Sequence, residues 1–170
     1  TRVSDAVGVF IGILQTGSTD TLYIGYGSEG YGYYIENGNV QNSASFVTNG
    51  AFGTTSGKLD VVGVALNLDD NELRFYKNGS ALGSAAISIT AGSYGFGVSQ
   101  TQSGNLVIAN YGQDSSFAGY KSSGSDNATD DNGQGDFYDA PPSGFLAMCS
   151  ANLPDPTIGP QTSTQADDHF

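Results

Sequence analysis

The residues best suited to bind a metal lie in one short acidic stretch. Its carboxylates are Asp126, Asp130, Asp131 and Asp136, separated mainly by Asn, Thr and Gly. Ca²⁺ prefers oxygen ligands of this kind and accepts irregular geometries. An EF-hand is excluded, because an alignment on Asn132-Gly133 places an alanine at the first ligand position. The stretch is therefore interpreted as a solvated, Asx-rich loop, with an irregular calcium site as the alternative and no other cofactor expected.

Groups that could transfer protons are scarce in the rest of the chain. The single histidine, His169, lies in the polar C-terminal tail, so no serine has an obvious general base. A glycosidase needs two facing carboxyls roughly 5 to 9.5 Å apart, and no expected strand carries an Asp/Glu-x-Asp/Glu pair. The phosphate-binding pattern G-x4-G-K-S/T is absent as well. We therefore predict that the chain is not an enzyme.

Five tyrosines in the first quarter of the chain form the most suggestive binding cluster. They are Tyr23, Tyr26, Tyr31, Tyr33 and Tyr34, interspersed with glycines. Tyrosine beside Gly and Asn makes an adaptable contact surface for sugars or proteins. Tyrosine is also an ordinary cross-strand partner in sheets. A binding patch and plain packing, with about half of the rings in the core, are both consistent with this pattern.

Short β-branched and aromatic runs between glycine-rich turns predict an all-β chain. The clearest is a three-stranded meander over residues 58–84, where Val62, Val64 and Leu66 alternate with smaller residues. Its second turn, Asn78-Gly79, and the earlier Asn37-Gly38 have the sequence that type I′ hairpin turns prefer. Further strands are predicted at 7–14, 21–26, 31–36, 39–41, 92–99 and 105–110. Together these elements predict an antiparallel β-sandwich.

Charge and hydropathy exclude two classes of partner. Seventeen acidic and five basic residues give a net charge of −12, which repels phosphate backbones and anionic lipids. The chain has no apolar run of the ~18 residues that a membrane-spanning helix requires. We therefore expect no nucleic-acid partner and no membrane insertion.

The sandwich is expected to occupy residues 1–153. Three prolines then follow within residues 154–160, and they deprive this stretch of the amide donors that a sheet centre needs. Residues 154–170 are therefore predicted to form an extended, Pro-rich exit linker or tail.

Two segments carry a family resemblance. Residues 60–79 read DVVGVALNLDDNELRFYKNG and resemble the central strands of SPRY (B30.2-like) domains, with their V-G-V-x-L-D and L-x-F-Y-x-N-G patterns. The resemblance implies a concanavalin A-like jelly-roll sandwich. Residues 140–158 read APPSGFLAMCSANLPDPTI and are similar to the segment that closes SPRY-like modules in structural proteins of tailed bacteriophages, especially marine ones.

The chain departs from the SPRY pattern at its start. SPRY domains usually open with a Trp-containing strand, and this sequence has no Trp. We expect that the opening strand lies before Thr1 or is replaced. A missing strand leaves an open sheet edge, which favours pairing with another chain.

The resemblance implies a non-catalytic display module of a virion, either a tail fibre or spike domain or a capsid decoration. Such a module fixes loops, here residues 114–139, on a rigid sandwich. Expected partners are other virion proteins or copies of the chain itself, and a host-surface glycan or protein. The expected location is the extracellular particle. The alternative is a carbohydrate-binding, lectin-like module of a secreted or cell-surface protein, supported by the tyrosines and the acidic loop.

Overall fold

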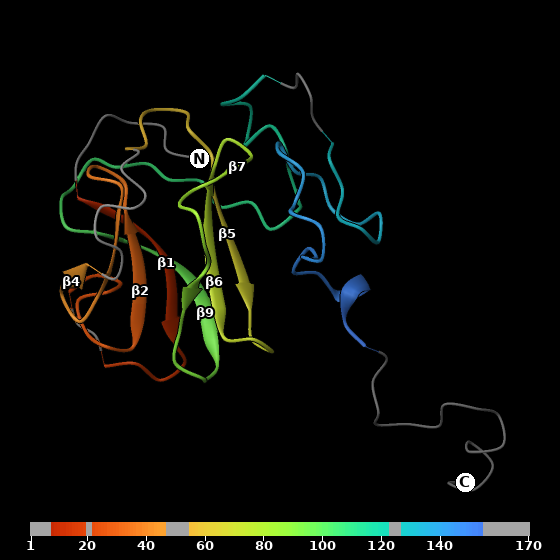
Figure 1. Cartoon of the computed structure of the whole chain (residues 1–170). Helices are drawn as coiled ribbons and strands as arrows, with labels where there is room; N and C mark the ends of the chain where they lie inside the picture. The colour runs from red at the N-terminus through yellow and green to blue at the C-terminus, as the bar shows by residue number, and fades with distance from the viewer. Residues whose placement is uncertain (1–7, 20–21, 47–54, 123–126, 155–170) are drawn as a thin grey trace, which may run out of the picture.

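The computed structural model describes residues 8–19, 22–46, 55–122 and 127–154. Within these ranges the chain forms nine strands and one short 3-10 helix, η1 (Ser150–Asn152). The strands build two antiparallel sheets that lie one in front of the other (Figure 1). The predicted all-β sandwich is therefore confirmed. Among the described residues, no helix has the length and apolar character needed to cross a membrane.

The first sheet has the strand order β4-β3-β2-β1-β9. Its strands are β1 (Val9–Gln15), β2 (Gly30–Tyr34), β3 (Asn39–Asn42), β4 (Ser45–Phe46) and β9 (Tyr94–Gln100). Ile11 of β1 lies opposite Tyr33 of β2 on one side and Val98 of β9 on the other. A strand from near residue 100 thus pairs with the first strand, and this sheet depends on long-range contacts.

The second sheet is the meander predicted from residues 58–84. It consists of β5 (Val62–Asn67), β6 (Glu72–Lys77) and β7 (Ser80–Ala81), with β8 (Ile87–Ser88) also paired to β6. At its second turn Asn78 and Gly79 have φ values of 47° and 75°. A type I′ turn requires positive φ at both central positions, so this turn prediction is confirmed.

Because successive side chains along a strand point to opposite faces, each sheet has one apolar face. The apolar faces of the two sheets meet in the core. Ile13, Tyr33 and Val40 from the first sheet and Leu73 and Phe75 from the second are fully buried. The rings of Tyr33 and Phe75 lie 5.6 Å apart between centroids and join the sheets across this core. Because each such side chain contributes about 1.5–3 kcal/mol on burial, this core is the main source of the sandwich's stability.

Two of the predicted strands are wrong. Residues 22–26 form turns and bends, with Gly25 at φ 91° and the Tyr26 N–H donating back to the Tyr23 carbonyl at 2.9 Å. Residues 105–110 form no continuous strand, and only Val107 lies in a β-bridge. In residues 22–26 the apolar side chains hold a loop against the face of a sheet, and the backbone does not extend the edge of a sheet.

The hairpin between β2 and β3 is confirmed, but its turn was predicted wrongly. Tyr34 pairs with Asn39, so residues 35–38 form a four-residue turn in which only Gly38 of the Asn-Gly pair has positive φ. Ile35 inside this turn is fully buried. Its packing into the core lengthens the turn beyond the two residues of type I′.

The described residues between 105 and 154 follow β9 as a mostly irregular region, most of which is drawn to the right of β5 in Figure 1. Within this region an isolated antiparallel β-bridge joins Ala128 and Phe137. Of the predicted exit linker, only Pro154 lies within the described residues.

Candidate functional site on the outer face of the first sheet

The outer face of the first sheet, which is turned away from the core, is floored by glycine. Gly12 of β1 lies opposite Gly32 of β2 and Gly97 of β9. A Cβ added to Gly32 would lie 2.1 Å from the Ile24 carbonyl oxygen. The absence of side chains on this floor therefore lets the backbone of residues 22–29, the crossing segment, lie directly on the sheet.

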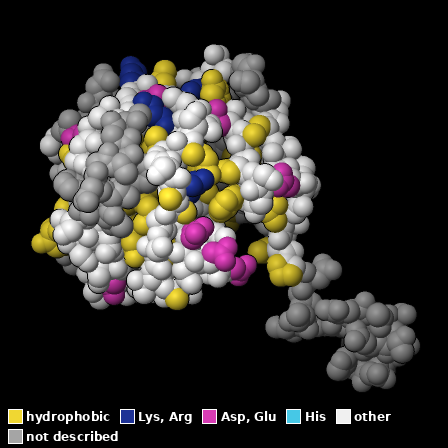
Figure 2. Space-filling view, in the orientation of Figure 1, with side chains coloured by type: hydrophobic (Ala, Val, Ile, Leu, Met, Phe, Trp, Pro, Cys, Tyr) yellow, Lys and Arg dark blue, Asp and Glu magenta, His cyan; other side chains and the backbone are white. Residues whose placement is uncertain are grey.

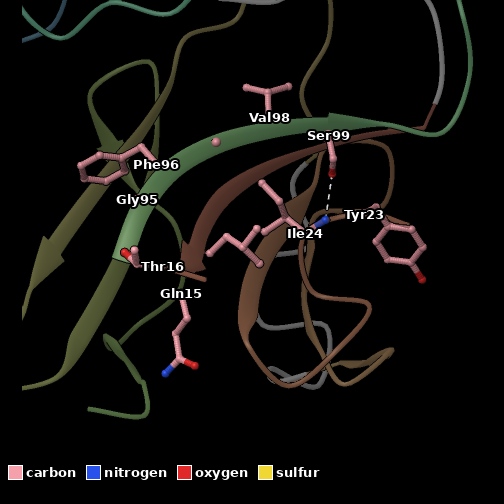
Figure 3. Close-up of a pocket in the computed structure, with 10 residues that line it drawn as sticks. Gln15, Thr16, Tyr23, Ile24, Gly95, Phe96, Val98 and Ser99 are labelled. Atoms are coloured by element: carbon pink, nitrogen blue, oxygen red, sulfur yellow. Dashed lines mark hydrogen bonds between the residues drawn. The ribbon is translucent and has the colours of Figure 1, made fainter. Parts of the chain in front are cut away.

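The crossing segment is held on this floor by burial and by hydrogen bonds. The Ile24 side chain is buried, and its N–H donates to Ser99 Oγ of β9 at 2.9 Å (Figure 3). The Gly25 carbonyl accepts the Ala44 N–H at 3.0 Å. Because β9 and the turn between β3 and β4 each contribute a bond, the segment and the side chains that it carries have a fixed position.

Four aromatic rings form a ladder across this outer face: Tyr26, Tyr23, Phe10 and Tyr34. Phe10 stacks between Tyr23 and Tyr34, with centroid distances of 4.2 and 4.5 Å and interplanar angles of 15° and 9°. Tyr26 meets Tyr23 edge-on at 5.4 Å. Tyr26 is 45% exposed, so the ladder has one end open to a partner.

A carboxylate closes the other end of the ladder. The Tyr34 hydroxyl donates to Glu36 Oε2, and the Gly8 N–H donates to Glu36 Oε1. The hydrogen bond to Glu36, assisted by burial, raises the pKa of Tyr34 to about 12. Tyr34 therefore stays neutral at physiological pH and holds its ring in place without exchanging a proton.

A pocket of about 380 Å³ adjoins the ladder at Tyr23 (Figure 3). Leu14, Thr16, Tyr23 and Ile24 form its walls, and Gly95 and Gly97 of β9 lie at its floor. The described residues that line it include no Asp, Glu, His, Cys, Lys or Arg. Such a pocket binds by shape and a few hydrogen bonds and offers no acid or base near neutral pH.

The structure divides the five tyrosines of the predicted cluster between two faces. Tyr31 and Tyr33 are buried in the core, whereas Tyr23, Tyr26 and Tyr34 belong to the outer-face ladder. This division agrees with the expectation that about half of the five rings pack in the core. The binding role of the three outer tyrosines stays a prediction.

Sequence reasoning missed two contributors to this face. Phe10 lies in an apolar run that reads as a wholly buried strand, yet its ring is on the outer face opposite Tyr34. Ser99 was predicted only as part of a strand, and it anchors the crossing segment. The alternation of Val9, Phe10 and Ile11 was the available signal, since neighbouring strand residues point to opposite faces.

In the acidic stretch, Asp130 is a buried acceptor for protein donors. Its Oδ1 accepts the N–H groups of Asn132 and Gln134 at 2.9 and 2.8 Å. Its Oδ2 accepts the Ala147 N–H and the Asn152 side-chain amide, each at 2.7 Å. Burial raises the pKa of Asp130, but these hydrogen bonds outweigh burial and lower the pKa below 3.8. Asp130 thereby ties the loop to the segment that ends in η1.

The other predicted calcium ligands do not gather around Asp130. Asp131 Oδ2 accepts the Gly144 N–H at 2.8 Å, Asp136 Oδ1 is buried without a hydrogen-bond partner among the described residues, and Asp126 lies outside the described residues. Nowhere in the described ranges do three His, Cys, Asp or Glu side chains come together as metal ligands. The described geometry thus gives the calcium hypothesis no support.

Comparison with known families gives one match. The SPRY domain family matches residues 2–114, more than half of the chain and every strand from β1 to β9. The SPRY resemblance predicted from residues 60–79 is therefore confirmed, whereas the bacteriophage origin stays a prediction. None of the curated proteins compared with the chain matches it.

Proposed function

The chain belongs to the SPRY family, and from this premise we propose that it is a non-catalytic protein-binding module whose contact surface is the aromatic ladder with its adjoining pocket. SPRY domains mediate protein–protein interactions. The observation that carries the proposal is the exposed end of the ladder, at Tyr26 and Tyr23, beside an apolar pocket on a rigid sheet. Tyrosines supply a large, stiff contact area at low cost in conformational entropy.

The non-catalytic part of the proposal is supported by the ionisable groups near this surface. Tyr34 has a pKa of about 12 and donates to Glu36. Glu36 in turn accepts two donors, from Tyr34 and Gly8. Such groups are engaged in holding the ladder, and no acid–base pair faces the pocket within the described lining.

We place this module in the structural protein of a virion, as a tail fibre or spike domain or as a capsid decoration. The support is the similarity of residues 140–158 to the closing segment of SPRY-like modules in phage structural proteins. The proposed partners are other virion proteins, copies of this chain or a host-surface protein, and the proposed location is the extracellular particle.

A sedimentation experiment tests both parts of the proposal. Particles are purified on a density gradient from the lysate in which the chain is made, and the chain is followed by mass spectrometry. Tyr26→Ser is compared with Tyr120→Ser, because the two tyrosines are 45% and 48% exposed and Tyr120 lies outside the ladder. We expect the native chain and Tyr120→Ser to sediment with particles and Tyr26→Ser to be retained at least about tenfold less, as for an interface hot spot. A native chain found only at the top of the gradient contradicts the virion setting, and equal retention of the two variants contradicts the ladder.

A lectin-like module is the second candidate, because the exposed Tyr26 ring offers a platform on which a sugar ring can stack. A glycan array with and without EDTA separates the two. Glycan binding that Tyr26→Ser removes and EDTA leaves intact favours the lectin, and silence across the array removes it.

A further inference from the structure

The first sheet ends in two edge strands of very different length. Within the part of the chain that the structure describes, β4 has two residues, whereas β9 has seven. A long edge strand presents a row of unpaired N–H and C=O groups, which is a template for another strand. The edge of β9 is therefore the place where this sheet can be extended.

The hydrogen bonds on either side of β9 determine which backbone groups face outward. The Thr101 N–H donates to the Gly8 carbonyl at 2.8 Å, and the Thr16 N–H donates to the Ser93 carbonyl at 2.9 Å. The antiparallel register between these two bonds runs without a break. Since bonded and non-bonded pairs alternate in an antiparallel ladder, every second residue between them bonds to β1.

By this alternation, the N–H and C=O groups of Gly95, Gly97 and Ser99 bond to β1. The N–H and C=O groups of Phe96 and Val98 point toward the open edge. No backbone hydrogen bond from another described segment reaches Phe96 or Val98. The Val98 side chain is 41% exposed. Figure 3 shows it pointing away from β1 and from the crossing segment.

The sequence of β9 lacks the residues that normally prevent strand addition, and the ring of Tyr111 contacts Phe96, at 6.3 Å between centroids, on the face opposite to Gly95 and Gly97. Natural edges carry Lys, Pro, bulges or inward-pointing charges. Here the sequence from Gly79 to Gln113 contains no Asp, Glu, Lys, Arg or Pro. The equivalent edge strand of the second sheet, β5, differs, because none of its six residues is exposed.

Charge favours a different protein over a second copy as the occupant of this edge. Two copies of the chain carry −12 each, and Figure 2 shows Asp and Glu side chains spread over one face of the molecule. Two such copies repel one another over the range of a Debye length. An uncharged or basic strand meets no such repulsion. Next to the edge, the pocket over Gly95 and Gly97 has apolar walls from Leu14 and Ile24 and takes the side chains on one face of an added strand.

We propose that an extended segment of a different protein, with apolar residues at alternate positions and a neutral or basic charge, adds to β9 as a further strand. Its backbone pairs with Phe96 and Val98, and its alternate side chains enter the pocket of about 380 Å³. This inference rests on the proposed function, since it takes the partner to be a protein, and it specifies the form in which that protein binds.

Amide hydrogen exchange on the full chain tests the proposal, with a synthetic peptide as the probe. The peptide alternates Val and Thr, has a Lys at each end and is capped at both termini; its control is N-methylated at every residue, so that neither of its edges can donate a hydrogen bond. In the free chain we expect the amides of Phe96 and Val98 to exchange at least 100-fold faster than that of Gly97. Millimolar peptide should slow both at least tenfold, and the N-methylated peptide should not.

Two substitutions at one position make the test specific. Val98→Pro removes an outward donor while the bonds of Gly97 and Ser99 to β1 persist, so the peptide should no longer protect Phe96. Val98→Thr keeps the donor and should retain protection. Unaltered protection of the Gly97 amide in both variants shows that β9 itself is intact.

Several outcomes overturn the proposal. Protection of Phe96 and Val98 in the free chain means that the edge is already covered, and protection that grows with protein concentration alone means that a second copy is the occupant. No effect of millimolar peptide, or equal protection in Val98→Pro, also contradicts it. Tyr26→Ser keeps the two proposals apart: if it abolishes retention on particles while Val98→Pro does not, the ladder stands and strand addition to β9 is wrong.

Discussion

The described residues of the sandwich, between 8 and 100, and those of the region between 105 and 154 are held together by different forces. In the sandwich, two hydrogen-bonded sheets bury side chains such as Ile13, Tyr33 and Phe75. In the later region, side-chain oxygens take the place of neighbouring strands. Asn110 Oδ1 accepts the N–H groups of residues 112 and 113 at 2.7 and 2.8 Å, and Asp130 accepts four donors.

In the later region acid acts on a buried carboxylate, Asp130, whereas the lowered carboxylate pKa values in the sandwich belong to Glu29 and Asp60, which lie outside its apolar core. Apolar burial does not depend on protonation, whereas a carboxylate that accepts several N–H groups loses acceptor capacity when it is protonated. The candidate binding surface lies on the sandwich, since the ladder rings come from β1, β2 and the crossing segment. The surface should therefore survive conditions that loosen residues 127–154.

The largest expected effect is in the core of the sandwich. Phe75→Ala removes a fully buried ring that faces Tyr33 and should lower the free energy of unfolding by about 3–5 kcal/mol. Tyr76→Ala, on the opposite face of the same strand, is the control and should cost clearly less. Urea unfolding followed by far-UV circular dichroism measures both, and equal losses contradict the assignment of the core face.

The next effect concerns the glycine floor. Gly32→Ala places a Cβ 2.1 Å from the Ile24 carbonyl oxygen, whereas a Cβ on Gly95 meets nothing within 4 Å. Gly32→Ala should therefore cost about 1–3 kcal/mol as an overpacked site, and Gly95→Ala should be nearly neutral. Faster amide exchange at Ile24 in Gly32→Ala alone would show that the crossing segment has moved, and no difference between the two variants rules out the direct contact.

A local effect is expected at Asp130. Asp130→Asn removes an acceptor for the Ala147 amide, so exchange at Ala147 should accelerate at least tenfold while the unfolding midpoint of the sandwich changes little. Asp131→Asn serves as the control, because the carboxylate of Asp131 accepts the Gly144 N–H and not that of Ala147, so exchange at Ala147 should change less.

Acid should reproduce the Asp130 substitution. The pKa of Asp130 is lower in the folded chain than its usual 3.8, so its stabilising contribution is complete above pH 3.8 and is lost as the pH falls through the folded pKa. Exchange at Ala147 that stays slow while the sheets unfold at low pH contradicts the division into two regions.

The smallest effect is at the closed end of the ladder. Because the pKa of Tyr34 is raised to about 12, above its usual value of 10, the stabilisation is complete below pH 10 and is lost between pH 10 and 12. Absorbance at the tyrosinate band should show a late titration step near pH 12 that Tyr34→Phe lacks. If both chains titrate alike, Tyr34 does not donate to Glu36.

Patterns local in the sequence predicted the sheets well. The alternation of Val62, Val64 and Leu66 identified β5. Asn78-Gly79 identified a type I′ turn, which requires positive φ only at those two residues. The shared face of Tyr94, Phe96 and Val98 likewise follows from a period of two.

Features that depend on distant residues were not predicted. Residues 22–26 were predicted as a strand, because no residue near them in the sequence indicates how they pack. Gly12, Gly32 and Gly97 leave the outer sheet face without side chains, and residues 22–26 lie against that face. The carboxylate of Asp130 suggested a metal ligand, because two of its four donors, Ala147 and Asn152, are 17 and 22 residues away. In both cases the partner is set by tertiary packing and leaves no local pattern.

Site-specific photo-crosslinking tests the central claim, that the open end of the aromatic ladder contacts a protein partner, most directly. A benzophenone amino acid replaces Tyr26 in one chain and the comparably exposed Tyr120 in another, and both are irradiated on purified particles. We expect a single dominant adduct to one identified virion or host protein from position 26 and at most a weak, dispersed signal from position 120. The same adduct in equal yield from both positions, or none from position 26, would contradict the claim.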